Sequence, residues 1–171
     1  MKTKKSLCFL VGLFVILVWI WGFAAPALSE TLKCKSEAKV REQNSDMVTE
    51  EHYVGATIRE GSLTCDNGET ATLRSYGTWD VIFKKEGFSQ TYTVLTFNDN
   101  SKILTKFQGR QIPDPEGKAD WIWSGMTGTS EILKGTNRFK GIKGSVSFEG
   151  KQLPSKISTS EWTFTYTLPP K

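Results

Sequence analysis

The sequence predicts an all-β protein, an eight-stranded antiparallel up-and-down barrel preceded by an N-terminal signal helix. Alternation of apolar and polar residues with period two dominates the chain after residue 30. Turn-forming residues separate the alternating runs, and no run of ten or more residues in that region keeps a helical period. Short turns connect antiparallel neighbours, and eight strands must close or cover their edges, which favours a barrel. A two-sheet β-sandwich is the alternative.

The N-terminal segment has the pattern of an export signal. Three lysines lie within the first five residues, an uncharged run covers 7–25, and small residues follow. We expect residues 1–29 to be a signal peptide, cleaved before Leu28 or Glu30, and residues 30–171 to form a single periplasmic or secreted domain. An uncleaved membrane anchor is the alternative, because the uncharged run approaches the ~20 residues that span a bilayer.

The charge balance changes when this segment is removed. The chain has 22 basic and 18 acidic residues, and three of the basic residues belong to the signal, which leaves 19 against 18. The remaining lysines and arginines alternate with acidic and hydroxyl residues. A nucleic-acid binder needs a clustered basic face, so this class of function is not expected.

The cysteines predict one disulfide. Cys8 lies in the signal, whereas Cys34 and Cys65 form an even pair in an oxidising compartment. Two buried free thiols remain an alternative. A metal site is disfavoured because the domain has no CxxC motif and His52 is its only histidine, so we expect neither a metal nor a cofactor.

The first and last strands carry the clearest alternation. Residues 32–41 place Leu32 and Cys34 on one face and lysines on the other, and residues 161–168 alternate Trp162 and Phe164 with threonines. Both patterns are typical of half-buried strands.

Six further runs complete the eight predicted strands. They cover residues 53–59, 71–83, 88–97, 102–110, 121–132 and 145–149. Turn chemistry such as Asp66-Asn67-Gly68 separates them, and helix is limited to a turn near residues 134–139.

In an antiparallel hairpin, the residue numbers of each pair of facing residues have the same sum, and pairing Cys34 with Cys65 fixes that sum and with it the register. That register sets Val40 against Arg59, whereas the apolar Ile58 needs a shift of one residue to face the interior. A β-bulge repairs the parity, and Gly61 is the candidate for it. The same hairpin places its turn in the polar residues 44–51, which we expect to form a loop.

Residues 135–150 read GTNRFKGIKGSVSFEG. This segment resembles the entry to a late strand in the allene oxide cyclase and dirigent barrels, and in small exported bacterial proteins of uncharacterised function. The resemblance extends to residues 68–71 and 107–109. It implies an eight-stranded, calycin-like barrel that can hold an apolar cavity. No catalytic or pocket residue of these families has a matching motif here, so none is transferred.

The strands are rich in aromatic residues on one face, with charged residues on the other. These aromatic residues either fill the core or line a cavity for a small apolar ligand. The candidate cavity-lining residues are Trp79, Phe107, Trp121, Trp123, Trp162 and Phe164.

The sequence contains no catalytic constellation, and serine hydrolysis lacks its G-x-S-x-G motif. We therefore expect an exported barrel that binds a small apolar ligand or serves as a non-catalytic envelope or secreted module. The alternative is an isomerase or cyclase that acts on an apolar substrate, for which Asp80 or Glu131 would supply the acid. A third hypothesis is a partner-binding surface, which needs an exposed aromatic patch.

Overall fold

The computed structural model describes residues 29–170 apart from 84, 119 and 125–128, so the expected signal segment lies outside the described residues. The described chain is all-β, with one short 3-10 turn, η2 (Asn137–Phe139). Nothing helical in these residues is long and apolar enough to cross a membrane. The strands are β1 (Ser29–Thr49), β2 (His52–Cys65), β3 (Thr70–Ile82), β4 (Glu86–Phe97), β5 (Lys102–Ile112), β6 (Trp121–Ser124), β7 (Thr129–Gly135), β8 (Lys143–Gln152) and β9 (Ile157–Thr167).

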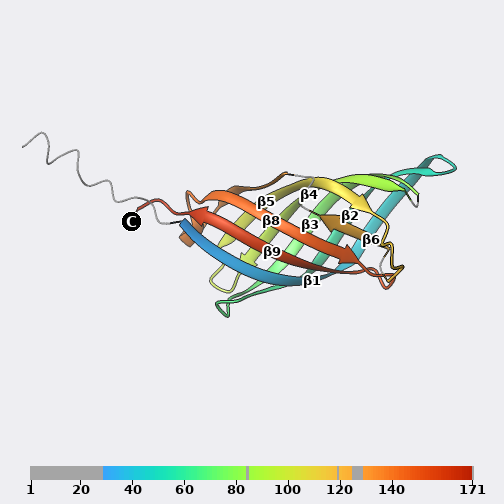
Figure 1. Cartoon of the computed structure of the whole chain (residues 1–171). Helices are drawn as coiled ribbons and strands as arrows, with labels where there is room; N and C mark the ends of the chain where they lie inside the picture. Colours follow the sequence, from blue (N-terminus) through green and yellow to red (C-terminus); the bar gives the residue numbers. More distant parts are fainter. Residues whose placement is uncertain (1–28, 84, 119, 125–128, 171) are drawn as a thin grey trace, which may run out of the picture.

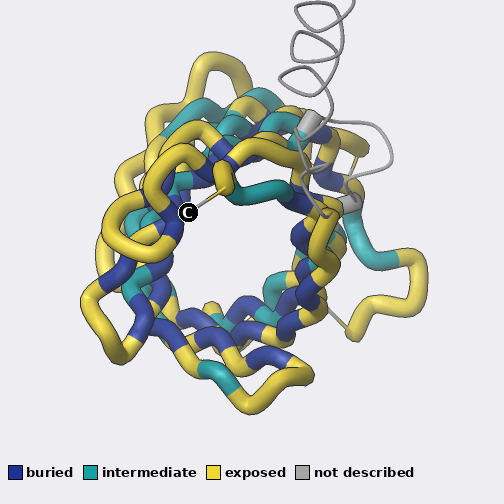
Figure 2. The backbone as a smooth tube through the Cα atoms, turned by 90° about the vertical axis from the view of Figure 1, so that its left-hand side faces the viewer, coloured by how far each residue is buried: buried dark blue, intermediate teal, exposed yellow. Residues whose placement is uncertain are grey.

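The strands close into an antiparallel barrel. Pairing runs from β1 through β5 in chain order, and β9 pairs with both β1 and β8 (Figure 1). The ring is completed through β6 and β7, which lie between β5 and β8. Seen along the barrel, the buried positions line the inside of a continuous ring (Figure 2). The predicted barrel is confirmed, and the two-sheet sandwich is wrong.

The predicted strand 121–132 is two strands that share one position in the barrel wall. β6 pairs with the last residues of β5, and β7 pairs with the first half of β5. β8 pairs with both pieces, with β6 over four residue pairs and with β7 only at Glu131 and Ser145. The prediction of one uninterrupted strand is therefore corrected, whereas the number of positions around the barrel remains eight.

The β1–β2 hairpin contains a bulge, but not at Gly61. Pairing is regular from the cysteines to Val40 and Arg59, and the register then shifts so that Glu42 faces Ile58. The extra residue is Arg41 on β1, and the arginine of the Val40–Arg59 pair faces the interior. Ile58 lies on the outer face, opposite the exposed Tyr76 of β3. The predicted bulge assumed that the apolar side chain would face inward, and that assumption is wrong.

The bulge changes which side chains of β1 face inward. Before Arg41 the even residues from Leu32 to Ala38 are buried, and after it Gln43 and Ser45 line the end of the lumen. The predicted loop 44–51 is also wrong, because strand pairing continues to Thr49 and His52 and leaves a turn at Glu50 and Glu51. This hairpin projects at the end of the barrel opposite the C-terminus (Figure 1).

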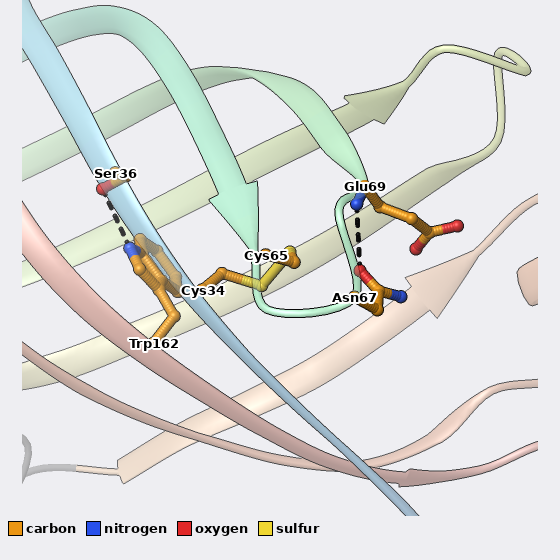
Figure 3. Close-up of a disulfide and its surroundings, with 6 residues drawn as sticks. All are labelled: Cys34, Ser36, Cys65, Asn67, Glu69 and Trp162. Atoms are coloured by element: carbon orange, nitrogen blue, oxygen red, sulfur yellow. Dashed lines mark hydrogen bonds between the residues drawn. A yellow bond between two sulfur atoms is a disulfide. The ribbon is translucent and has the colours of Figure 1, made fainter.

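Cys34 and Cys65 lie directly opposite each other on β1 and β2, with their sulfur atoms at bonding distance, 2.11 Å. The cysteine pair is the one that the sequence predicts. Trp162 of β9 packs on the other side of Cys34 and donates its indole N–H to Ser36 Oγ at 3.0 Å (Figure 3). The disulfide therefore fixes the hairpin near the end of the barrel that carries the C-terminus.

The apolar core occupies this end of the barrel. Leu63 and Leu95 are fully buried, and Phe164 and Ile103 are 1% exposed. Other members of the core are Leu32, Ala71, Leu73, Phe97, Ile132, Phe139, Ile142, Val146 and Tyr166. Side chains fill this half of the lumen, as is usual in small eight-stranded barrels.

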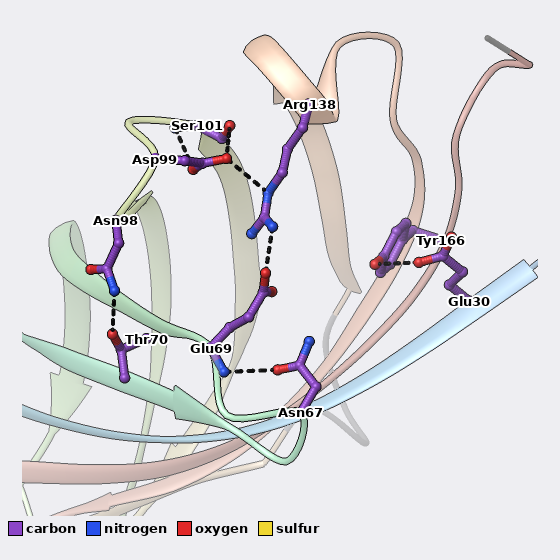
Figure 4. A network of polar contacts seen from close by, with 9 residues as sticks. All are labelled: Glu30, Asn67, Glu69, Thr70, Asn98, Asp99, Ser101, Arg138 and Tyr166. Atoms are coloured by element: carbon purple, nitrogen blue, oxygen red, sulfur yellow. Dashed lines mark hydrogen bonds and ion pairs between the residues drawn. The ribbon is translucent and has the colours of Figure 1, made fainter.

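A polar network covers the packed end. Arg138 of η2 forms ion pairs with Glu69, and with Asp99 at 3.3 Å (Figure 4). Its guanidinium also lies 4.5 Å from the Phe139 ring centroid. The bond from Arg138 lowers the pKa of Glu69. Turns after β2, β4 and β7 thereby meet over the core, and this end of the barrel is closed.

The segment 135–150 builds that closure. Phe139 and Ile142 are 4% and 6% exposed, and a Cβ atom at Gly135 would lie 2.2 Å from the Phe139 carbonyl oxygen. Gly141 has φ of +80°, a conformation that favours glycine. The motif therefore has a structural role in this protein.

Candidate functional site: the lumen of the barrel

The interior changes in composition halfway along the strands. Toward the end of the barrel that carries the β1–β2 turn, the next inward residue after Leu73 on β3 is Ser75, and the next inward residue after Leu95 on β4 is Thr93. On β9, the next inward residue in the same direction from Trp162 is the buried Ser160. These residues lie at neighbouring levels, because Leu73 pairs with Leu95 and Ser75 pairs with Thr93. The barrel thus has an apolar, filled half and a half lined by small polar residues.

Small side chains do not fill the second half. It contains a cavity of about 60 Å3, bordered by aromatic rings and by hydroxyl groups from β1, β3, β4 and β9. Its aromatic border consists of Trp79, Phe107, Phe148 and Trp162. Its hydroxyl border consists of Ser36, Ser75, Thr78, Ser89, Thr91, Thr93, Ser158 and Ser160.

Hydrogen bonds hold the cavity's two indoles. Trp79 donates its N–H to Thr57 Oγ1 at 2.9 Å, and Trp162 donates to Ser36. The Trp79 ring also lies against Gly55, where a Cβ atom would come within 2.4 Å of it. Because buried indoles seek a partner for their N–H, these bonds fix the ring orientations and leave apolar faces toward the cavity.

A wider vestibule of about 280 Å3 follows at the end that carries the β1–β2 turn. Its lining residues are Gln43, Ser45, Tyr53, Thr57, Arg59, Trp79, Val81, Phe83, Gln111, Trp121 and Gln152. Gln43, Ser45 and Phe83 are exposed, so the vestibule opens to solvent. Arg59, Trp79 and Gln111 line both spaces and therefore mark the boundary between vestibule and inner cavity.

Arg59 is the only charged side chain among the described residues that line the two spaces. Its Nη2 donates a hydrogen bond to Gln152 Oε1 at 2.9 Å, and its Nε is enclosed. Burial lowers the pKa of Arg59 to about 10, so the guanidinium stays positive at neutral pH. The boundary between the vestibule and the inner cavity therefore carries one positive charge in a lining that includes aromatic side chains.

The structure separates the six aromatic residues singled out from the sequence. Trp79, Phe107 and Trp162 border the inner cavity, and Trp121 borders the vestibule. Phe164 lies in the packed core, stacked beside Trp162 with their ring centroids 6.0 Å apart. Trp123 belongs to β6 by its backbone, and its side chain lies outside the described residues.

The acids considered for an isomerase lie outside the barrel. Glu131 is exposed, and the Asp80 side chain is 60% exposed and accepts a bond from the His52 ring at 2.6 Å. No aspartate or glutamate is among the described lining residues of either space. Within the described chain there is also no cluster of histidine, cysteine and acidic residues suited to a metal ion.

The hydroxyl residues and Arg59 are not among the candidate site residues that the sequence predicts. Reading the inward face of each strand beyond its apolar positions would have found Ser36, Ser75 and Ser160, because their parity follows that of the core residues. Arg59 could not be assigned to the interior in this way, since its orientation depends on the position of the bulge.

No family model, curated protein or solved structure matches the chain. The function is therefore inferred from the chemistry of the lumen.

Proposed function

We propose that the protein is an exported, non-catalytic barrel that binds a small molecule with an apolar or aromatic body in its lumen. One observation carries the proposal: the side chains stop filling the barrel at a common level and leave a cavity that continues into a solvent-open vestibule. Eight-stranded barrels are just wide enough to be filled or to hold one small ligand.

The sizes of the two spaces indicate how a ligand would lie. A dry cavity that holds benzene has about 150 Å3, so the inner cavity of about 60 Å3 is too small for an aromatic ring. The vestibule of about 280 Å3 is close to the lower limit for ligand pockets. We place the body of the ligand in the vestibule, against Trp79, Tyr53 and Trp121, and a smaller group at the inner cavity.

Binding is tested on the purified, oxidised domain with aromatic probes of one to two rings, by tryptophan fluorescence and native mass spectrometry. We expect 1:1 complexes in the wild type. Ser158→Leu should fill the inner cavity and weaken binding at least tenfold, whereas Ser147→Leu, on the exposed face of β8, should leave it unchanged. Equal effects of the two substitutions, or no complex in the wild type, would refute the proposal.

Export is supported by the pattern of the first 29 residues and by the cysteine pair. The resemblance of residues 135–150 to the allene oxide cyclase and dirigent barrels is part of the same proposal. Expression of the full chain, cell fractionation and mass spectrometry of the N-terminus test it. We expect a periplasmic or secreted chain that begins at Leu28 or Glu30. An intact Met1 in the membrane fraction would instead identify an anchored barrel.

A further inference from the structure

We propose that the ligand is an organic carboxylate whose anionic group binds Arg59 at the inner end of the vestibule, while its aromatic body lies in the vestibule. This inference rests on the proposed function and specifies its ligand class. It follows from the position of the cation, from the chemistry of the surrounding lining and from the shape of the lumen.

The position of Arg59 comes from its strand. β2 keeps one register with β3 from Thr64 to His52, so its odd residues face inward throughout. Arg59 therefore projects from the barrel wall at the level where the inner cavity meets the vestibule. A cation at this constriction lies on the path of a molecule that enters from solvent.

The lining has a positive net charge. Besides Arg59, the described lining of both spaces consists of hydroxyl, amide, aromatic and apolar residues, and it contains no acidic residue. The guanidinium of Arg59 is a planar fork of N–H donors, and its Nη2 donates to the Gln152 amide oxygen. This fork matches the two oxygens of a carboxylate.

The single cation also selects the charge of the ligand. A carboxylate carries one negative charge, whereas a phosphate monoester carries nearly two at neutral pH. Burial of the second charge would need another cation, and Arg59 is the only one in the described lining. The geometry thus favours a carboxylate over a phosphate ester.

The shape of the lumen orients the ligand. The inner cavity is narrow and bordered by hydroxyls such as Ser89 and Ser160, which can donate hydrogen bonds to an anion. The wider vestibule is bordered by Trp79, Tyr53 and Trp121, whose faces suit an aromatic ring. The anionic end therefore points inward and the aromatic end points toward solvent.

The test compares three probes of one shape: 2-naphthoate, the uncharged 2-naphthamide and 2-naphthyl phosphate. Affinities are measured by tryptophan fluorescence and isothermal titration calorimetry at neutral pH. We expect the wild type to bind the carboxylate at least tenfold more tightly than the amide, and more tightly than the phosphate.

Two lumen variants and one control locate this preference. Arg59→Gln removes the charge, and Gln152→Glu leaves the guanidinium in place but sets a carboxylate beside it. Both should abolish the preference for naphthoate while amide binding stays within about twofold. Arg74→Gln removes an exposed arginine from the outer face of β3 and should keep the preference. Gln152→Glu retains the arginine, so the test does not depend on the folding of Arg59→Gln.

The outcomes separate the two proposals. Equal affinity of the wild type for naphthoate and naphthamide, or a preference that survives both lumen variants, would overturn the carboxylate inference and leave binding in the lumen intact. A tighter complex with the phosphate would overturn the selection of charge. Failure of all three probes to bind at millimolar concentration would overturn the proposed function as well.

Discussion

The guanidinium of Arg59 lies between two spaces lined by aromatic and hydroxyl residues, and the same burial that lowers its pKa to about 10 opposes folding. A charged group is expensive to bury, and replacing it with an apolar side chain of similar length often stabilises a protein. Such a residue is expected where binding rather than stability determines the side chain.

We therefore predict that Arg59→Met raises the free energy of unfolding by about 1–2 kcal/mol, because it removes the desolvated charge. The loss of the bond to Gln152 offsets part of this gain. Urea denaturation measures the change, with Arg74→Met on the outer face as the control. A loss of stability comparable to that of a core truncation would contradict the prediction.

Tyr166 gives a second prediction, for alkaline pH. Burial first, and then its bond to Glu30, raise the pKa of Tyr166 to about 12 from the usual 10 (Figure 4). The folded state holds this proton more tightly than the unfolded state, so the stabilisation is complete below pH 10 and is lost as the pH rises toward 12.

Urea midpoints of the wild type and of Tyr166→Phe, measured between pH 9 and pH 12, test this dependence. The wild type should lose more stability over that interval than the variant. Parallel curves for the two proteins would show that the tyrosine proton does not contribute.

Among the elements, β1 determines the shape of the open end. The bulge at Arg41 lets the even residues of its first half and the odd residues of its second half face inward. Removing Arg41 would restore regular pairing and keep Val40 inside and Gln43 and Ser45 facing the vestibule. Removing Lys39 would also absorb the extra residue, but it would turn Val40 outward and bring Arg41 inward beside Arg59.

Deletion of Arg41 should therefore cost less than about 1 kcal/mol, since its ion pair with Glu60 is exposed. Deletion of Lys39, two residues earlier, should lower stability more, because it turns Val40 outward and places the charged Arg41 inside beside Arg59. Thermal unfolding followed by circular dichroism compares the two deletions, and similar losses in both would contradict the role assigned to the bulge.

The disulfide acts on the β1–β2 hairpin. It closes a loop with a sequence separation of 31, for which the chain-entropy model gives a stabilisation of about 3–4 kcal/mol. The double variant Cys34→Ala/Cys65→Ala should lose this amount in urea denaturation. Reduction of the wild type with dithiothreitol should give the same loss, and an unchanged midpoint after reduction would show that the bridge does not stabilise the fold.

At the scale of the whole molecule, alternation and turn residues were sufficient to predict the barrel and the cysteine pair. They were not sufficient for the wall between β5 and β8, because nothing in the run 121–132 marks the change of register between β6, where Trp123 pairs with Gln111, and β7, where Ile132 pairs with Thr105. The predicted bulge at Gly61 is wrong because apolar character does not determine which residue of β2 faces inward. At this level of the barrel the charged Arg59 faces the lumen, and its apolar neighbour Ile58 faces outward.

The molecule as a whole is a barrel closed at one end and open at the other. Arg138 and Phe139 cover the packed core, and the hydroxyl-lined half opens through the vestibule. Under the proposed function, a ligand enters from this open end: we expect its inner end to lie at Arg59 and the closed half to take no part in binding.

Nuclear magnetic resonance of the 15N-labelled domain titrated with 2-naphthoate tests this most directly. We expect shifts of the Trp79 indole N–H and of the backbone amides at Arg59 and Gln111, with no change at Leu32 or Phe139. Shifts confined to the outer faces of the strands, or centred on the closed end, would contradict binding in the lumen.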